Sequence, residues 1–201
     1  MKEDRTRWNA KFMDRDKDGE PSSWVVTMCM AAPGKRALDL AAGMGRNAAF
    51  LAGQGFEVLA LDLADKAVRS LKAQNMSGLF PVQADLDDYP LRPESFDLIV
   101  CCMFLDRKLF PSIVESLRSG GIVLYETAME SDLPGMKQIS NRNYLLRTNE
   151  LLHMFFRLRI LSYQEVAVPD DKEGGKKVIA RLAAQKGWTG DVPLEHIMKT
   201  R

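Results

Sequence analysis

One short stretch limits the possible folds of this chain more than any other feature. Residues 37–40 are mostly apolar and read as a strand, Gly43 and Gly45 form a turn, and residues 46–53 read as a helix. Glycine lets backbone N–H groups approach a ligand closely, and a helix N-terminus attracts negative charge. The pattern therefore predicts a small-molecule site where the first strand ends.

An acidic residue at the end of the next apolar run supports this interpretation. Residues 56–61 read as a second strand, and Asp62 follows them directly. A carboxylate at this point of a strand–turn–helix unit can accept hydrogen bonds from both hydroxyls of a ribose. The sequence thus favours a cofactor that contains a nucleoside.

Strand-like and helical segments alternate from residue 35 onward. We expect strands at residues 37–40, 56–61, 79–83, 96–103 and 122–126, with helices near 46–53, 64–74 and 107–117. This alternation is typical of a parallel sheet with helical crossovers. The fourth segment is continuously apolar, which indicates a central strand covered by helices on both faces.

The two ends of the chain complete the expected fold. Pro21 opens a helical segment at 21–31, and a helix at 149–155 precedes two strands, 158–168 and 176–184, which we expect to form an antiparallel hairpin. The prediction is a doubly wound α/β three-layer sandwich with a mostly parallel seven-stranded sheet and one antiparallel strand near the C-terminus. It is one domain overall, with an N-terminal lid and helix (1–34), a cofactor-binding part (35–186) and a polar tail (187–201).

Charge and composition restrict the partners. The chain has 201 residues and a formal net charge of +1, so no overall field attracts nucleic acid or an anionic membrane. No apolar run is long enough to cross a bilayer, and three cysteines do not make a disulfide framework. We expect a cytoplasmic protein with reduced thiols, a monomer or homodimer, that acts on a small molecule.

Several motifs in fixed order resemble those of the class I S-adenosylmethionine-dependent methyltransferases. They lie at residues 38–45, 61–63, 83–86, 96–101 and 117–124. Ala41 departs from the pattern, because many members have a glycine there. Residues 8–9, 20–22, 45–47 and 144–147 are similar to the branch that contains tellurite-resistance and thiopurine methyltransferases.

The resemblance implies S-adenosylmethionine as the cofactor and a set of residues that bind it. At the methionyl end these are Asp39, Ala41, Gly43, Gly45, Arg46 and Cys101, and at the nucleoside end they are Asp62, Leu63, Asp85 and Leu86. Asp39 is implied near the ammonium group and Arg46 near the carboxylate, although an arginine in a first helical turn more often faces solvent. Asp62 is implied at the ribose, Leu63 on the adenine face, and Asp85 with Leu86 at the adenine edge.

The implied reaction is methyl transfer to a small acceptor. Such a displacement depends mainly on alignment of the two reactants. A soft nucleophile, such as a thiol or a selenium or tellurium oxyanion, needs no general base, and no catalytic residue is assigned. Candidates for the acceptor side are Arg107, Tyr144 and Arg147, for which a surface ion pair is the simpler interpretation of each arginine.

Two other functions fit part of the pattern. Residues 43–48 also satisfy a looser dinucleotide fingerprint, so an NAD-dependent oxidoreductase is an alternative, but Asp39 precedes the glycines where such turns usually stay apolar. A sensor that binds S-adenosylmethionine without catalysis is the other alternative. An accessible acceptor cleft beside the sulfonium would distinguish an enzyme from a sensor.

No metal site is expected. Residues 14–19 resemble the opening of an EF-hand calcium loop, but Val25 stands where the closing glutamate belongs. Cys101 and Cys102 are adjacent in a strand, so their side chains should face opposite sides of the sheet and cannot easily chelate one ion. We interpret them as core residues.

Overall fold

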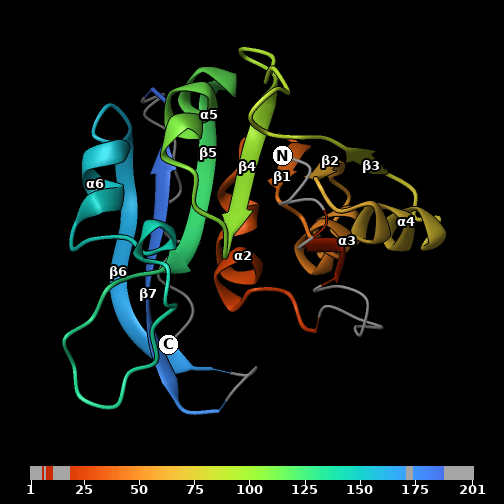
Figure 1. Cartoon of the computed structure of the whole chain (residues 1–201). Helices are drawn as coiled ribbons and strands as arrows, with labels where there is room; N and C mark the ends of the chain where they lie inside the picture. The colour runs from red at the N-terminus through yellow and green to blue at the C-terminus, as the bar shows by residue number, and fades with distance from the viewer. Residues whose placement is uncertain (1–5, 7, 11–18, 171–173, 188–201) are drawn as a thin grey trace.

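The sheet of this protein has the predicted doubly wound topology. The computed structural model describes residues 6, 8–10, 19–170 and 174–187. Seven strands lie in the order β3-β2-β1-β4-β5-β7-β6, with β7 antiparallel to both of its neighbours and the other pairs parallel (Figure 1). The single antiparallel strand and the C-terminal hairpin are confirmed.

The elements follow the expected order along the chain. The strands are β1 (Arg36–Leu40), β2 (Glu57–Asp62), β3 (Leu79–Gln83), β4 (Phe96–Cys102), β5 (Leu117–Ala128), β6 (Arg159–Pro169) and β7 (Lys176–Gln185). The helices are α2 (Ser23–Met28), α3 (Arg46–Gly53), α4 (Asp65–Ala73), α5 (Phe110–Ser116) and α6 (Glu150–Met154), with short 3-10 turns η1 (Cys29–Ala31), η2 (Arg107–Leu109) and η3 (Arg142–Tyr144).

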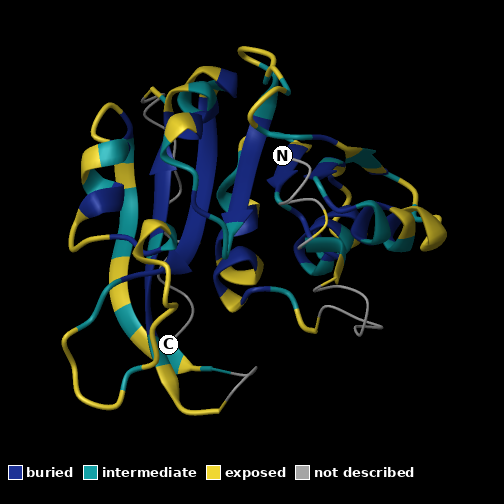
Figure 2. Ribbon diagram, viewed as in Figure 1, coloured by how far each residue is buried: buried dark blue, intermediate teal, exposed yellow. Residues whose placement is uncertain are grey.

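Alternate side chains of the central strands pack into two separate hydrophobic cores, one on each face of the sheet. On one face, Leu38, Ile99 and Tyr125 pack with residues of α5 and α6. On the other, Val100 and Leu124 pack with residues of α2, α3 and α4. The strands β4 and β5 are buried along most of their length (Figure 2), as expected for strands covered on both sides.

Three elements differ from the prediction. The fifth strand begins at Leu117 rather than Ile122, because the chain at Gly121 runs very close to β4: an added Cβ would lie 2.9 Å from the carbonyl oxygen of Phe96. The register of β4 and β5 shifts at this point. The helix α2 starts at Ser23 with Ser22 as its N-cap, so Pro21 precedes the cap instead of opening the helix.

The third difference is the segment expected as one helix at 107–117, which is divided into η2 and the shorter α5.

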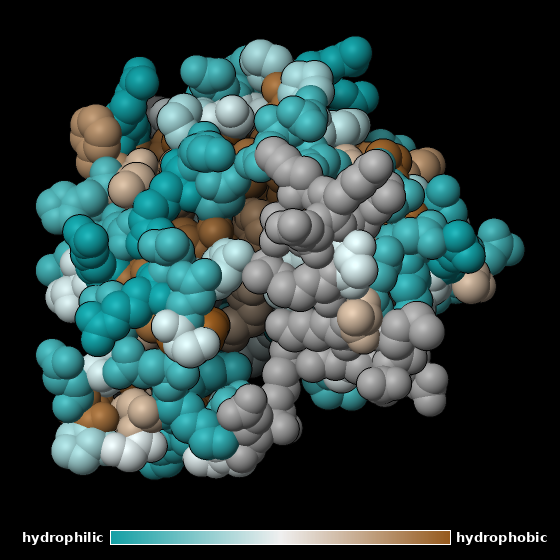
Figure 3. All heavy atoms as spheres, in the orientation of Figure 1, coloured by the Kyte–Doolittle hydropathy of each residue, from teal (hydrophilic) through white to brown (hydrophobic). Residues whose placement is uncertain are grey.

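Among the described residues, no helix is long and apolar enough to span a membrane. Hydrophilic residues dominate the visible surface, and hydrophobic ones show between them near the middle of that face (Figure 3).

Two adjacent phenylalanines provide a test of the core on the α5–α6 face. Phe155 is 0% exposed and its ring lies 5.0 Å from that of Phe110, whereas Phe156 is 76% exposed. Phe155→Ala should lower the free energy of unfolding by about 3–5 kcal/mol, since it removes a packed ring and leaves a cavity. Phe156→Ala should cost less than about 0.5 kcal/mol. Urea unfolding of both variants measures the difference, and equal losses would contradict the core assignment.

Candidate functional site

The predicted site residues meet at one edge of the sheet. The strand order reverses between β1 and β4, and the segments that follow β1, β2, β3 and β4 all leave from the carboxyl ends of those strands. In open α/β sheets, ligands bind at this kind of switch point. The sequence motifs at residues 38–45, 61–63, 83–86 and 96–101 therefore converge in space although they are far apart in the chain.

The glycine turn, residues 41–45, has an unusual backbone that requires its small residues. Ala41, Gly43 and Gly45 all have positive φ angles, of 53°, 59° and 90°. Gly45 is also the N-cap of α3, and a Cβ there would lie 1.9 Å from a methyl group of Leu71 in α4. The structure thus gives Gly45 a packing role, and Ala41 occupies a conformation that favours glycine.

The carboxylate of Asp62 holds the glycine turn in place. Its Oδ2 accepts a 2.7 Å hydrogen bond from the N–H of Gly43, and its Oδ1 accepts a 2.8 Å bond from the N–H of Ala64. The side chain is buried, at 7% exposure. Both carboxylate oxygens thus accept a backbone N–H, one from the glycine turn and one from the segment that leads into α4.

The other predicted residues of the nucleoside end lie nearby on separate loops. Leu63 follows Asp62 and is half-buried, and its carbonyl oxygen accepts a hydrogen bond from the Gln83 side chain at the end of β3. Asp85 accepts a hydrogen bond from the N–H of Asp87 through Oδ1. Leu86 packs against the core on the α5–α6 face. The loops after β2 and β3 are thereby joined.

At the methionyl end, Asp39 and Arg46 differ in exposure. Asp39 is buried at 1% exposure in β1, and it alternates with Leu38 and Leu40, so it projects toward α2 and α3. Arg46 is half-buried at the start of α3, and its Nη1 lies 3.4 Å from the carbonyl oxygen of Glu20.

The two adjacent cysteines point to opposite faces, as predicted. Cys101 belongs to the core on the α5–α6 face, while Cys102 packs against the other core. Burial raises the pKa of the Cys101 thiol to about 12, so it is protonated and apolar at neutral pH. A thiol in this state is a small hydrophobic group and no nucleophile, and its place beside the cofactor stays a prediction.

The described part of the N-terminal segment lies on the glycine turn. Trp8 packs against a small cluster of Met44, Ala64 and Ala67, and Asn9 Oδ1 lies 3.4 Å from the N–H of Lys66. This position is compatible with the predicted lid, which stays a prediction. The calcium-like motif at 14–19 falls mostly outside the described residues, and among those described no group of metal-binding side chains occurs.

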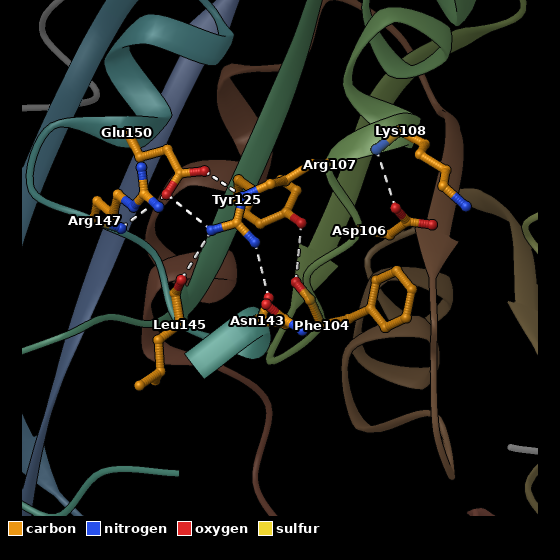
Figure 4. A network of polar contacts seen from close by, with 9 residues as sticks. All are labelled: Phe104, Asp106, Arg107, Lys108, Tyr125, Asn143, Leu145, Arg147 and Glu150. Atoms are coloured by element: carbon orange, nitrogen blue, oxygen red, sulfur yellow. Dashed lines mark hydrogen bonds and ion pairs between the residues drawn. The ribbon is translucent and has the colours of Figure 1, made fainter. Parts of the chain in front are cut away.

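Arg107 has protein partners that the sequence did not reveal. Its Nε and Nη2 lie 2.6 and 3.0 Å from the two carboxylate oxygens of Glu150, and its guanidinium also donates to the carbonyl groups of Asn143 and Leu145 (Figure 4). The surface ion pair considered as the simpler interpretation is thus a partly buried network. Arg107 thus joins residues 143–145 to the first turn of α6, and its guanidinium is already held by these protein groups.

Glu150 was missed by the sequence reasoning. An acidic residue in the first turn of a helix was a visible signal, but its partner lies 43 positions away. Burial would raise the pKa of Glu150, but the hydrogen bonds from Arg107 and from the N–H of Arg147 outweigh it and hold the pKa below the ordinary value.

Tyr144 and Arg147 flank the end of β5. The N–H of Leu146 donates to the carbonyl of Ala128, and the N–H of Glu130 donates to the carbonyl of Leu146. Tyr144 is half-buried and the Arg147 side chain is exposed. Both residues therefore lie beside the carboxyl end of β5, which is separated from β1 by β4 alone. Their role on the acceptor side stays a prediction.

Comparison with known proteins agrees with this geometry. Residues 37–121 match the family model described as a methyltransferase domain. The chain is 30% identical over 140 residues to hemagglutinin 1 of Eikenella corrodens, and 29% identical over 108 residues to a malonyl-[acyl-carrier protein] O-methyltransferase of Enterobacter lignolyticus. These matches cover 65% and 51% of this chain but only 46% and 43% of the relatives, so the chain spans less than half of each relative's length.

The fold is shared with solved structures. TehB from Haemophilus influenzae superposes with a TM-score of 0.73 at 22% identity, over 89% of this chain and 67% of TehB. Other structures with this fold include S-adenosylmethionine-dependent methyltransferases. At such identities the likeness concerns the fold.

The positive φ of Ala41 leads to a stability prediction. A non-glycine residue with this backbone conformation destabilises the folded state by roughly 1–2 kcal/mol. A glycine removes that strain, but it also gives the unfolded chain more conformational entropy, which favours unfolding by about 0.4–1 kcal/mol. Ala41→Gly should therefore leave the free energy of unfolding unchanged or raise it by up to about 1 kcal/mol. Ala42→Gly, at a buried neighbour without positive φ, should lower it. Chemical denaturation of both variants checks this, and a large loss in Ala41→Gly would contradict the backbone assignment.

The lowered pKa of Glu150 gives a pH prediction. A carboxyl with a lowered pKa in the folded state stabilises the protein above its unfolded pKa, near 4.5, and loses that contribution as the pH falls through the folded pKa. Glu150→Gln should thus be less stable than the wild type at pH 6, and the gap should narrow below pH 4.5. In an Arg107→Gln background the narrowing should become smaller, because only the contacts with Arg147 then lower the pKa of Glu150. A gap that stays constant from pH 6 to pH 3 would refute the ion pair.

Proposed function

We propose that this chain, a class I S-adenosylmethionine-dependent methyltransferase by its fold and by the match of residues 37–121, transfers a methyl group to a small-molecule acceptor. The observation that carries the proposal is the hydrogen bond from the glycine turn to the buried carboxylate of Asp62, at the point where the strand order reverses. The same place in the fold holds nucleotide-containing ligands in other α/β proteins.

The residues at this edge fit the cofactor that the family uses. Gly43 and Gly45 carry no side chain, so a ligand can approach the backbone of the turn closely, and the carboxylate of Asp62 lies directly beside it. In the proposed arrangement Asp62 accepts from the ribose hydroxyls and Leu63 lies on the adenine. Asp85 and Leu86 contact the adenine edge.

The methionyl end is proposed to lie near the first strand and helix. Buried Asp39 complements an ammonium group, and Gly43 and Gly45 border the chain of the amino acid. Arg46, which contacts Glu20, is placed within the same region and would neutralise the carboxylate. Cys101 contributes a neutral wall beside it.

The cofactor supplies a methyl group on a sulfonium, which a nucleophile can attack directly. The protein then has to align the acceptor and exclude water. We propose that Tyr144 and Arg147 border the acceptor, since both lie beside the end of β5, and that Arg107 with Glu150 holds their loop in place. A soft, anionic acceptor such as a thiolate or a selenium or tellurium oxyanion fits this arrangement, because it needs no base.

A panel assay tests the reaction. Purified protein would be incubated with labelled S-adenosylmethionine and a thiol, selenite, tellurite, a phenol or a small carboxylic acid, and label transfer would be measured. Transfer to one acceptor class supports the enzyme. Tight cofactor binding without transfer to any acceptor would instead support the sensor, and binding of a nicotinamide dinucleotide would refute both.

Asp62 provides the matching mutational test. Asp62→Ala should weaken binding of S-adenosylhomocysteine by about 1.5–3 kcal/mol, because it removes charged hydrogen bonds to the ribose and releases the glycine turn. The control is Asp65→Asn, which removes the charge that pairs with Arg69 at the surface of α4. Isothermal titration calorimetry measures both variants, and wild-type affinity in Asp62→Ala would contradict the ribose assignment.

A further inference from the structure

A partly buried ion pair near the carboxyl edge of the sheet has no role in any of the contacts proposed above. Arg181 in β7 lies opposite Glu126 in β5, and its Nε is 2.6 Å from Glu126 Oε2. Glu126 is only 3% exposed. Burying two charges costs solvation energy, and replacing such a pair with apolar residues is often neutral or stabilising. Stability alone therefore gives no reason for this pair.

The other oxygen of Glu126 is linked to two more elements, α2 and α3. Its Oε1 accepts a 3.0 Å hydrogen bond from the hydroxyl of Ser22, the N-cap of α2. The N–H of Ser22 donates to Asn47 Oδ1 at 2.9 Å, and Asn47 is the second residue of α3. We refer to Ser22, Asn47, Glu126 and Arg181 as the Ser22 cluster. It links β7 and β5 to the helix that follows the glycine turn.

The Ser22 cluster lies on the same face of the sheet as Asp39. In the register, Asp39 pairs with Val100 and Glu126 pairs with Cys102, and residues two apart on β4 face the same side. Burial raises the pKa of the Cys102 thiol, and the charges of Glu126 and Asp39 raise it further, so both carboxylates act on one thiol. The cluster is therefore adjacent to the methionyl end of the proposed cofactor site.

We propose that Glu126 is a positioning residue for cofactor binding, which acts through Ser22 and Asn47 on the first turn of α3. Arg181 fixes one oxygen of the carboxylate, which leaves the other aimed at the Ser22 hydroxyl. Ser22 in turn holds Asn47, so the start of α3 and the glycine turn before it are kept in one position. The same link seats residues 20–22 beside Arg46. The role of Glu126 in cofactor binding rests on the proposed function, whereas the contacts within the Ser22 cluster do not.

Amide hydrogen exchange of the ligand-free protein tests the geometry by itself. Glu126→Gln keeps the shape of the side chain but removes its charge, and Asn47→Ala breaks the link while it leaves Glu126 and Arg181 paired. Both should speed exchange of amides in residues 42–49 by at least about fivefold, because that segment opens more often. Asn47→Asp, which keeps an oxygen for the Ser22 N–H, should stay near the wild-type rate.

A matched control separates positioning from general loss of stability. Asp97 is also a buried carboxylate, held by Arg118 and by the N–H of Arg36, but it lies at the amino end of β4. Asp97→Asn should lower the melting temperature without faster exchange in residues 42–49 and without weaker binding of S-adenosylhomocysteine. Glu126→Gln and Asn47→Ala should weaken that binding at least about fivefold, and together by less than the product of the single effects.

The outcomes are distinct for the two proposals. Unchanged exchange in residues 42–49 in both Glu126→Gln and Asn47→Ala overturns the positioning role, as does an equal effect of Asp97→Asn. If the wild type binds no S-adenosylhomocysteine, the proposed function fails, and the exchange rates alone still decide whether the Ser22 cluster controls the glycine turn.

Discussion

The hydrogen bonds of Asp62 are the interaction on which the rest of the site depends. The turn after β1 contains three residues with positive φ, and such a backbone is held only where its surroundings fix it. The carboxylate at the end of β2 does so, since it accepts the N–H of Gly43 and the N–H of Ala64 together. It is also the group proposed to hold the ribose, so the ligand and the turn that receives it are positioned by the same atoms.

The two faces of the sheet use charge in similar ways. On the α5–α6 face, Arg107 joins η2 to the first turn of α6 through Glu150. On the other face, Arg181 and Glu126 join the C-terminal hairpin to the start of α2. The loops around the proposed cofactor and acceptor are thus held from both sides of the sheet.

Prediction from the sequence succeeded where the signal was local. The strand before Gly43, the strand before Asp62 and the C-terminal hairpin lie where apolar runs and turn residues put them. The predicted start of the fifth strand was wrong, because the close approach of Gly121 to Phe96 in β4 depends on a residue that is distant in the chain. Likewise, the sequence marked Arg107 as notable but supplied neither its partner nor its positioning role.

The amino-acid sequence by itself determined the alternation of strands and helices, the glycine turn and the carboxylates that follow the first strands. These depend on residue type and short spacing, which act over a few positions. Only the tertiary structure decided which charges meet. Glu126 with Ser22 and Arg107 with Glu150 are separated by 104 and 43 positions, and their contact follows from strand order and helix packing, which no local pattern encodes.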